Sequence, residues 1–488
     1  MICRDQLDLE STLVHENPFS SEKELLGWIS DALDEGFSGA YNFEDSTLFV
    51  KERRLDLVKS PYWIFDSLEG EDSHFFASSE QSILGVGVAK EWVFSESSFG
   101  DVDALLNLEH VSQKMARKIW LMGGWSFPKR TQARRAREKR TWSGFPFSRW
   151  VIPALTLNTV SNEREGRLVL AFCPNGYPSS LIQSKLRSYY EKLARTLIAP
   201  QRKPHPSPAA IHVKNRPSRE RWKSLVRRGL KSIHEGDLKK VVLARSMEIL
   251  FDHDLSCSTV LQKLIESNPQ STIFAIRKDD AVFMGCTPES LLILKNRELM
   301  VDCLAASTSR SSDPTTDELL ARELLEDRKS RYEHQLVVDQ ITKLLSNICS
   351  ETKVQESPSV KKLPKIQHLH TIAQGRLRPK VSILSVARTL WPTPAINGEP
   401  KEAAMRWIQE FEGIDRGWYS GVVGCLNGSG DDGKLLVSIR SGVIRGNRAV
   451  LFAGAGIVPQ SDPEKEFEET EWKMATMLDA LASTHSTR

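Results

Sequence analysis

Apolar side chains in the second half of the chain repeat with helical spacing in three segments. One segment begins at Ser218, a residue typical of a helix N-cap, and ends at Gly236. A second runs from about Thr316 to Leu345, and a third follows Asp462. Shorter apolar runs between these segments predict strands at residues 240–245, 272–276, 281–285 and 450–452. The pattern therefore predicts a structure that mixes helices and strands.

The first 200 residues show no cluster of candidate catalytic groups. Residues 200–217 hold five prolines and few large apolar side chains, which is the composition of a linker. We therefore expect an N-terminal subdomain at 1–200, a linker at 201–217 and a C-terminal region at 218–484. We expect the N-terminal subdomain to pack on the same body as the C-terminal region rather than to form a free domain.

The composition, with 40% apolar and 26% charged residues, is that of an ordinary globular protein. A net charge of +3 provides no large field for nucleic acid, and no apolar run is long enough to span a bilayer. The N-terminus has no apolar segment like that of a secretory signal. The seven cysteines are scattered and form no CxxC pair. These features predict a cytoplasmic protein in a reducing compartment, with no membrane and no nucleic-acid partner.

The most basic segment, Lys129–Arg140, has two interpretations. A run of lysines and arginines can bind RNA or lipid, or it can be a solvated loop. No aromatic residues interleave with its arginines, whereas proteins that hold single-stranded nucleic acid usually stack bases on aromatic rings. We therefore favour the solvated loop.

The third helical segment carries charged residues on one face. Glu466, Glu469 and Lys473 are spaced i, i+3 and i+7, so their side chains lie on the same side of the helix. Gly454 and Gly456 precede this helix and let a ligand approach the backbone closely. Carboxylates and an ammonium group beside such glycines suggest a site for a hard cation and an anionic ligand. The alternative is a solvated charged face.

Further candidate groups lie on other predicted elements. Glu289 follows a proline turn and precedes an apolar strand, so burial would raise its carboxyl pKa and suit it to donate a proton. Lys240 begins a strand, where a lysine is more often a solvated edge charge. Glu333 and His334 are adjacent on the second helical segment and do not share a face, which argues against a transition-metal pair. A magnesium site, with one carboxylate from this helix and one from the last, fits better.

Longer motifs in the second half of the chain share the order of one enzyme family. They are KVVLAR (240–245), TPESLL (287–292), RYEH (331–334), QHL (367–369), PTPAINGEP (392–400), SIR (438–440) and FAGAGIVPQSDPEKEFEET (452–470). Together they resemble the chorismate-utilising enzymes, which include isochorismate synthases, salicylate synthases, anthranilate synthase large subunits and aminodeoxychorismate synthases. The resemblance covers about residues 218–484.

Two positions separate the chemistries within this family. Lys240 resembles the lysine that activates water in isochorismate and salicylate synthases, where the amine-adding members typically have glutamine. Ala395 is similar to the isochorismate synthase pattern, whereas salicylate and anthranilate enzymes tend to have threonine. The resemblance therefore implies an isochorismate synthase that needs no glutamine amidotransferase subunit. A salicylate synthase and an inactive chorismate-binding protein remain as alternatives, and the downstream pathway, menaquinone, siderophore or salicylate, stays open.

The resemblance also implies a fold and a set of roles. The fold is α+β, a four-layer α/β/β/α sandwich with antiparallel sheets. Mg²⁺ would be bound by Glu333 and Glu469, with Glu466 reaching it through water. Lys240 would take a proton from water as it attacks C2 of chorismate, and Glu289 would protonate the departing C4 hydroxyl. The residues implied to bind or line the substrate are His368, Ala395, Arg440, Gly454, Gly456 and Lys473.

Three residues depart from the family's pattern. Ala306 stands where glycine is usual, in a turn near the substrate, and a Cβ there would change the backbone or the pocket. Ser330 replaces an acidic residue or asparagine three positions before the metal-binding Glu333, which would weaken the groups that orient the metal ligands. Trp391 replaces a histidine before the PTPA motif. None of these changes removes a group that the resemblance assigns to the chemistry, so we expect an active enzyme.

Overall fold

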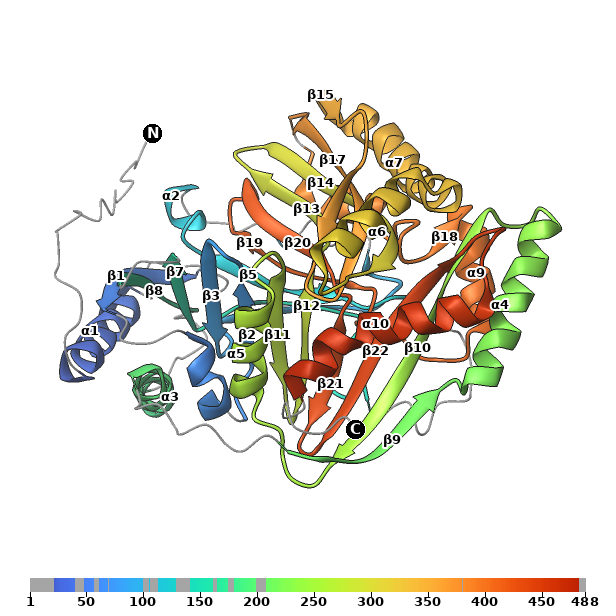
Figure 1. Ribbon diagram of the computed structural model, residues 1–488. Helices are drawn as coiled ribbons and strands as arrows, with labels where there is room; N and C mark the ends of the chain where they lie inside the picture. The colour runs from blue at the N-terminus through green and yellow to red at the C-terminus, as the bar shows by residue number, and fades with distance from the viewer. Residues whose placement is uncertain are drawn as a thin grey trace.

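The computed structural model describes residues 22–39, 48–56, 61–68, 70–99, 105, 113–128, 141–160, 165–173, 180–198, 208–379 and 381–481. Helices enclose two large antiparallel sheets in this part of the chain (Figure 1). The basic segment Lys129–Arg140 and the first residues of the linker at 201–217 lie outside the described residues.

The first sheet has 12 strands among the described residues, and its strands pair antiparallel. Its spatial order is β1 (Phe49–Asp56), β8 (Glu165–Phe172), β7 (Leu155–Val160), β3 (Gln81–Val86), β2 (Ser73–Ala77), β11 (Thr272–Lys278), β12 (Ala281–Thr287), β21 (Ser441–Arg445), β22 (Arg448–Ile457), β10 (Lys240–Phe251) and β18 (Gly398–Glu399), with β9 (Ala210–Arg216) also paired to β10.

The second sheet has 10 strands among the described residues and is antiparallel as well. Its order is β15 (Cys349–Val354), β17 (Ile366–Leu377), β14 (Glu298–Ser309), β13 (Ser290–Lys295), β20 (Asp432–Val437), β19 (Val422–Asn427), β5 (Trp120–Trp125), β6 (Ser148–Ile152) and β4 (Lys90–Phe94), with β16 (Ser359–Lys362) also paired to β17.

Helices cover the outer faces of both sheets. Those that pack on the first sheet are α1 (Glu22–Gly39), the 3₁₀ helix η2 (Pro61–Leu68), α3 (Ser180–Ile198), α4 (Arg219–His234), α5 (Cys257–Ser267) and α10 (Pro463–Leu481). Those that pack on the second sheet are α6 (Pro314–Glu326), α7 (Arg328–Ile348) and α8 (Ile383–Leu390), while α9 (Lys401–Phe411) lies against β10 and β18 and α2 (Gln113–Ala116) is a single turn before β5.

A third apolar cluster fills the space between the two sheets. It joins Met122 and Leu436 of the second sheet to Phe274, Phe283 and Phe452 of the first. Because the side chains of a strand alternate between its faces, one set of apolar residues can face this inner core and the other the helices outside. The resulting order of layers is helix, sheet, sheet and helix, so the predicted α/β/β/α sandwich is confirmed.

Residues before 200 contribute strands to both sheets. β2 pairs with β11 and places Phe75 opposite Ala275, while β5 pairs with β19 and places Met122 opposite Cys425. The range 201–217 also departs from a simple linker, since Ala210–Arg216 form β9 on the edge of β10. Most of the prolines lie before this strand, and the strand itself contains β-branched Ile211 and Val213.

The helix ends follow the capping residues of the sequence, with one difference. Ser218 accepts a hydrogen bond from Arg221 N at the start of α4, and Asp462 accepts from the first turn of α10, as predicted. The prediction of one helix from Thr316 to Leu345 is wrong, because α6 and α7 are separate. Asp327, with extended backbone, ends α6 and caps α7 by accepting a hydrogen bond from Ser330 N at 2.7 Å.

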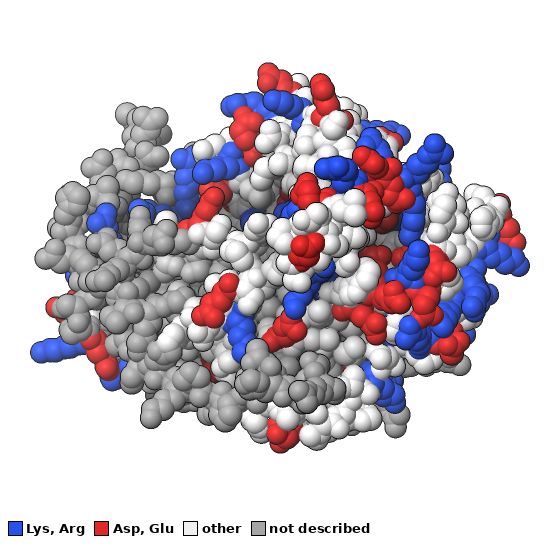
Figure 2. All heavy atoms as spheres, in the orientation of Figure 1, with Lys and Arg blue, Asp and Glu red and all other residues white. Residues whose placement is uncertain are grey.

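Charged side chains of both signs are interspersed on the face that α4 and α10 share (Figure 2). Arg219 and Lys223 of α4 both pair with Glu464 at the start of α10, the second at 2.6 Å. These pairs tie the two helices together near the N-terminal end of α10. None of the described helices combines the length and apolarity needed to cross a membrane.

Candidate active site

Glu289 lies at the junction between β12 and β13, deep in the protein. Only 4% of its surface is exposed, and its backbone oxygen accepts a hydrogen bond from Val437 N at 3.2 Å. Burial, and then the negative charge of Asp302, raise the pKa of the Glu289 carboxyl to about 8. The predicted rise is therefore confirmed, and the carboxyl carries a proton at neutral pH. The charges that oppose this rise are those of Lys361, Lys240 and Lys473.

Lys240 is the first residue of β10, and its side chain is fully buried. Its Nζ lies 2.9 Å from Glu333 Oε1 of α7, in an orientation that pairs the charges without forming a hydrogen bond. An ammonium group that is buried with unused N–H groups is a signal of function, because such burial is unfavourable without a ligand. This burial excludes the alternative of a solvated edge charge. The charge of Lys240 also acts to lower the pKa of the Glu289 carboxyl.

The charged face predicted for α10 points inward rather than to solvent. Glu466 is 1% exposed and accepts a hydrogen bond from Lys329 at 2.7 Å, while Glu469 pairs with Lys473 at 2.6 Å. Burial, and then the charge of Glu469, raise the pKa of Glu466. Burial also acts to raise the pKa of Glu469, but Lys473 outweighs it and the pKa is lowered. The alternative of a solvated charged face is therefore excluded for Glu466 and Glu469.

The carboxylates of α7 and α10 converge on one cation. Burial acts to lower the pKa of Lys329, but the charges of Glu466, Glu333 and Glu469 outweigh it and raise the pKa. The structure thus brings together the three glutamates that the sequence predicted to hold magnesium. Each of them is paired with a lysine, and the described residues contain no cluster of three ligand side chains as tight as a metal centre.

The chemistry of this set fits a magnesium ion. Carboxylate oxygens are the ligands that Mg²⁺ takes in proteins, and the negative charges of these three glutamates already act on the ammonium group of Lys329. Gly456 adds to the fit, since a Cβ at this position would lie 2.4 Å from Glu333 Oε1. Glycine is therefore required for the carboxylate to lie against β22.

Arg440 is nearly fully buried, and its Nη2 lies 2.9 Å from His368 Nε2. On the other side of the ring, His368 Nδ1 lies 3.2 Å from the Ala306 carbonyl oxygen, which can only accept. Burial, and then the charge of Arg440, lower the pKa of His368 well below its usual value. The ring is therefore neutral, with Nε2 accepting from Arg440 and Nδ1–H facing both the Ser307 hydroxyl at 2.9 Å and the Ala306 carbonyl oxygen. The hydrogen bond to His368 therefore fixes the orientation of the Arg440 guanidinium.

A small pocket opens beside this pair. It includes four of the residues predicted to contact substrate, Ala395, Arg440, Gly454 and Lys473. The full lining is Val242, Ala395, Ile396, Tyr419, Ser420, Ile439, Arg440, Ala453, Gly454 and Lys473. His368 and Gly456 are not among these residues, and their contact with substrate stays a prediction.

The glycines of β22 leave backbone donors free for a ligand. Opposite them on β10, Ala244 N donates to Glu412 and Val242 N to Asn397 O rather than to β22. Gly454 and Gly456 are therefore the non-hydrogen-bonded partners in this ladder, and their own N–H groups face the other edge of β22. β21 covers that edge only as far as Phe452.

Several residues of the site were not identified as functional from the sequence. Tyr419 lines the pocket and stacks on Phe452 with 5.3 Å between ring centroids, and no pattern around it distinguishes it from a core tyrosine. Lys329 had a signal, because it precedes Glu333 by four positions and so shares its helix face. Asp302 lies on a strand with no local sign that it would reach Glu289.

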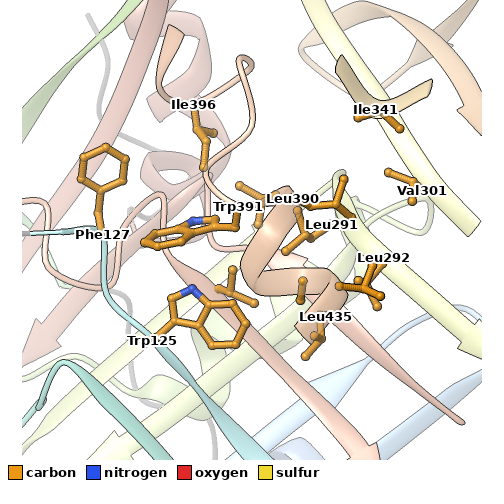
Figure 3. Close-up of a cluster of buried hydrophobic side chains, with 14 of the residues drawn as sticks. Trp125, Phe127, Leu291, Leu292, Val301, Ile341, Leu390, Trp391, Ile396 and Leu435 are labelled. Carbon is orange, nitrogen blue, oxygen red and sulfur yellow. The ribbon is translucent and has the colours of Figure 1, made fainter. Parts of the chain in front are cut away.

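The three departures from the family's pattern have distinct structural settings. Ala306 adopts a left-handed backbone with φ of 61° at a bulge in β14, a conformation that favours glycine. Ser330 Oγ donates to Asp327 at 2.6 Å, so its hydroxyl is used in the cap of α7. Trp391 packs with Trp125 and Phe127 in an apolar cluster (Figure 3), and its Nε1 donates to Ser420 O at 3.0 Å.

Comparisons with known proteins agree on one family. The sequence profile described as "Chorismate binding enzyme" matches residues 41–482. The isochorismate synthase MenF of Bacillus subtilis is 32% identical over 422 residues, which cover 83% of this chain and 87% of that protein. The salicylate biosynthesis isochorismate synthase of Pseudomonas aeruginosa is 32% identical over 365 residues, 74% of each chain.

Solved structures give the same result. A putative 2,3-dihydroxybenzoate-specific isochorismate synthase of Bacillus anthracis aligns with a TM-score of 0.67 and 27% identity, over 86% of this chain and 98% of that one. The menaquinone-specific isochorismate synthase MenF of Escherichia coli aligns with a TM-score of 0.76 at 23% identity, over 93% and 99% of the two chains, and supports the fold alone. The chain belongs to the family of chorismate-binding enzymes.

Proposed function

We propose that the protein is an isochorismate synthase that converts chorismate to isochorismate. The observation that carries this proposal is a pair of buried groups whose charges interact: Lys240, whose Nζ makes no hydrogen bond with the described residues, and Glu289, whose carboxyl pKa is raised to about 8. A base and an acid on the two sides of one site are what the addition of water at one ring carbon and its loss at another require.

The reaction balances without a co-substrate. Each turnover begins with Lys240 as a neutral amine, which takes a proton from water as the water oxygen bonds to C2 of the ring, and the ring double bonds shift. Glu289 gives its proton to the C4 hydroxyl, and the C4–O bond breaks to release water. Before the next turnover a proton returns from the Lys240 ammonium to the Glu289 carboxylate. One water enters and one leaves, so the product is an isomer of the substrate. Water is the nucleophile, and we therefore propose that no amidotransferase subunit takes part.

Arg440, Lys473 and the N–H groups of Gly454 and Gly456 would hold the two carboxylates of chorismate. The neutral ring of His368 fixes the Arg440 guanidinium for this role, and Ala395 shapes the pocket wall. A magnesium ion held by Glu333 and Glu469, with Glu466 acting through water, would supply positive charge for the ring carboxylate. We place the reaction in the cytoplasm, since the seven cysteines are scattered and their spacing indicates no disulfide framework.

Incubation of the purified protein with chorismate, with and without Mg²⁺, tests the proposal. We expect isochorismate, identified by chromatography, and its loss when magnesium is chelated. Salicylate with pyruvate as the product would replace the proposal with a salicylate synthase. Binding of chorismate in calorimetry with no turnover at any magnesium concentration would instead indicate an inactive binding protein.

A further inference from the structure

The peptide groups on both sides of Glu289 are held by charged side chains that the reaction itself does not use. Lys361 of β16 donates from Nζ to the carbonyl oxygen of Pro288 at 2.7 Å. Asp302 of β14 accepts at Oδ2 from the N–H of Ser290 at 3.2 Å. Because Pro288 and Ser290 flank Glu289, these two contacts fix the backbone that aims its carboxyl.

Asp302 is itself fixed from a third strand. His370 of β17 lies with Nε2 2.7 Å from Asp302 Oδ1, and both side chains are largely buried. Burial acts to raise the pKa of Asp302, but the hydrogen bond from His370 and the charge of Lys361 outweigh it and the pKa is lowered. Asp302 is therefore an anion at neutral pH, held between the ring of His370 and the peptide of Ser290.

We propose that Asp302 and Lys361 are positioning residues. They hydrogen-bond to the two peptide groups that flank Glu289 and place opposite charges near its carboxyl group. This inference rests on the proposed function, in which Glu289 delivers a proton to the departing hydroxyl. A proton donor must be aimed at its target and must hold its proton at the working pH. The two flanking residues supply both conditions through backbone contacts and through charge.

The two charges act in opposite directions on the same group. Asp302 raises the pKa of Glu289, whereas Lys361 is the foremost of the charges that lower it, and the outcome is about 8. The proposed function assigns neither residue a contact with substrate. The other ionisable groups that act on Glu289 or are acted on by it are Lys240, Lys473, Arg440 and Cys303.

The pH dependence of isochorismate formation separates positioning from general structural support. Asp302→Asn removes the charge but keeps an amide that can accept from Ser290, so we expect the alkaline fall in activity to move down by about one pH unit. Lys361→Met removes the opposing charge, so the alkaline fall in activity should move to higher pH. A merely structural role would lower activity without moving the two profiles in opposite directions.

Matched controls lie on the same strands. Glu298→Gln changes a carboxylate of β14 that pairs with Arg376 of β17 at 2.7 Å, as Asp302 pairs with His370. Lys362→Met changes the neighbour of Lys361, which pairs with Asp317 and Glu318 instead. Both controls should keep the wild-type pH profile.

A second measurement does not depend on turnover. The carboxyl of Glu289 can be titrated by ¹³C NMR in the substrate-free protein labelled at glutamate Cδ, with Glu289→Gln to assign the signal. We expect the midpoint to fall in Asp302→Asn and to rise in Lys361→Met. Unmoved midpoints, or shifts of the same sign, would overturn the inference. If wild-type protein forms no isochorismate but the midpoints move as expected, the proposed function fails while the relationship between these residues stands.

Discussion

Lys240 Nζ and Glu333 Oε1 lie 2.9 Å apart, although one residue begins a strand of the first sheet and the other belongs to a helix on the second. This contact joins the proposed base to the carboxylates that converge on Lys329. It exists only when both sheets and their helices are assembled, so the site is a product of the whole sandwich rather than of a local motif.

Replacement of Lys240 by methionine should abolish most of the activity. The change keeps an apolar stem of similar length but removes the group that takes a proton from water, so we expect kcat to fall by about 10²- to 10⁴-fold. Isochorismate formation followed by chromatography measures this. Lys239→Met changes the exposed neighbour and should leave the rate unchanged. A Lys240→Met enzyme with nearly full activity would show that the base is another group.

Glu289→Gln should lower the rate and change how stability depends on pH. A glutamine cannot donate a proton to the leaving hydroxyl, so kcat should fall, again by about 10²-fold or more. The folded-state pKa of Glu289 is raised to about 8, so the folded protein holds this proton more tightly than the unfolded chain does. The wild type therefore loses stability as pH rises from the ordinary carboxyl pKa toward 8.

The glutamine variant lacks this titration. Its melting temperature relative to wild type should therefore increase steadily between about pH 5 and pH 8. Thermal denaturation at a series of pH values is the measurement, and Glu298→Gln, at an exposed position, is the control. A difference that stays constant across this range would mean that Glu289 is not a buried, protonated acid in the native state.

Local spacing was enough to single out the charged residues of α10, whereas the roles of Lys240, Glu289 and Glu333 came from the resemblance, and Lys329 and Asp302 were missed. Glu466, Glu469 and Lys473 share a helix face by spacing alone, and Asp462 marks where that helix begins. The motifs and their order then predicted the family and its α/β/β/α fold. These signals are either local or shared with a family, so both kinds can be recognised without knowing which residues are in contact in three dimensions.

What was missed depends on contacts between distant parts of the chain. The apolar spacing predicts one continuous helix across Asp327. The helix breaks there because Asp327 adopts an extended backbone and caps the start of α7. The contact of His368 with Arg440 joins β17 of the second sheet to the residue before β21 of the first. Asp302 acts on Glu289 across strands whose pairing no periodicity reveals.

The glutamates that converge on Lys329 should determine magnesium affinity. We expect Mg²⁺ to raise the melting temperature of the wild type, because a ligand that binds only the folded state stabilises it. Glu333→Gln and Glu469→Gln should remove most of this shift, and Glu466→Gln, acting through water, should weaken binding by about 10- to 100-fold. Calorimetric titration with MgCl₂ gives the affinities directly. Glu468→Gln, the neighbour on α10, should bind as the wild type does, and equal binding by all four variants would exclude these carboxylates as ligands.

Ala306→Gly should be almost neutral for stability, unlike the same change one position earlier. Relief of a left-handed alanine gains about 1–2 kcal/mol, which offsets the extra freedom of glycine in the unfolded chain, about 0.4–1 kcal/mol, and the loss of a buried methyl group, about 0.8 kcal/mol. Ala305→Gly, on the same strand and also buried, has no such relief and should cost about 1.5 kcal/mol. Urea denaturation of both variants measures the difference. Equal losses would show that the Cβ of Ala306 contributes more to packing against Leu324 and Leu369 than its backbone conformation costs.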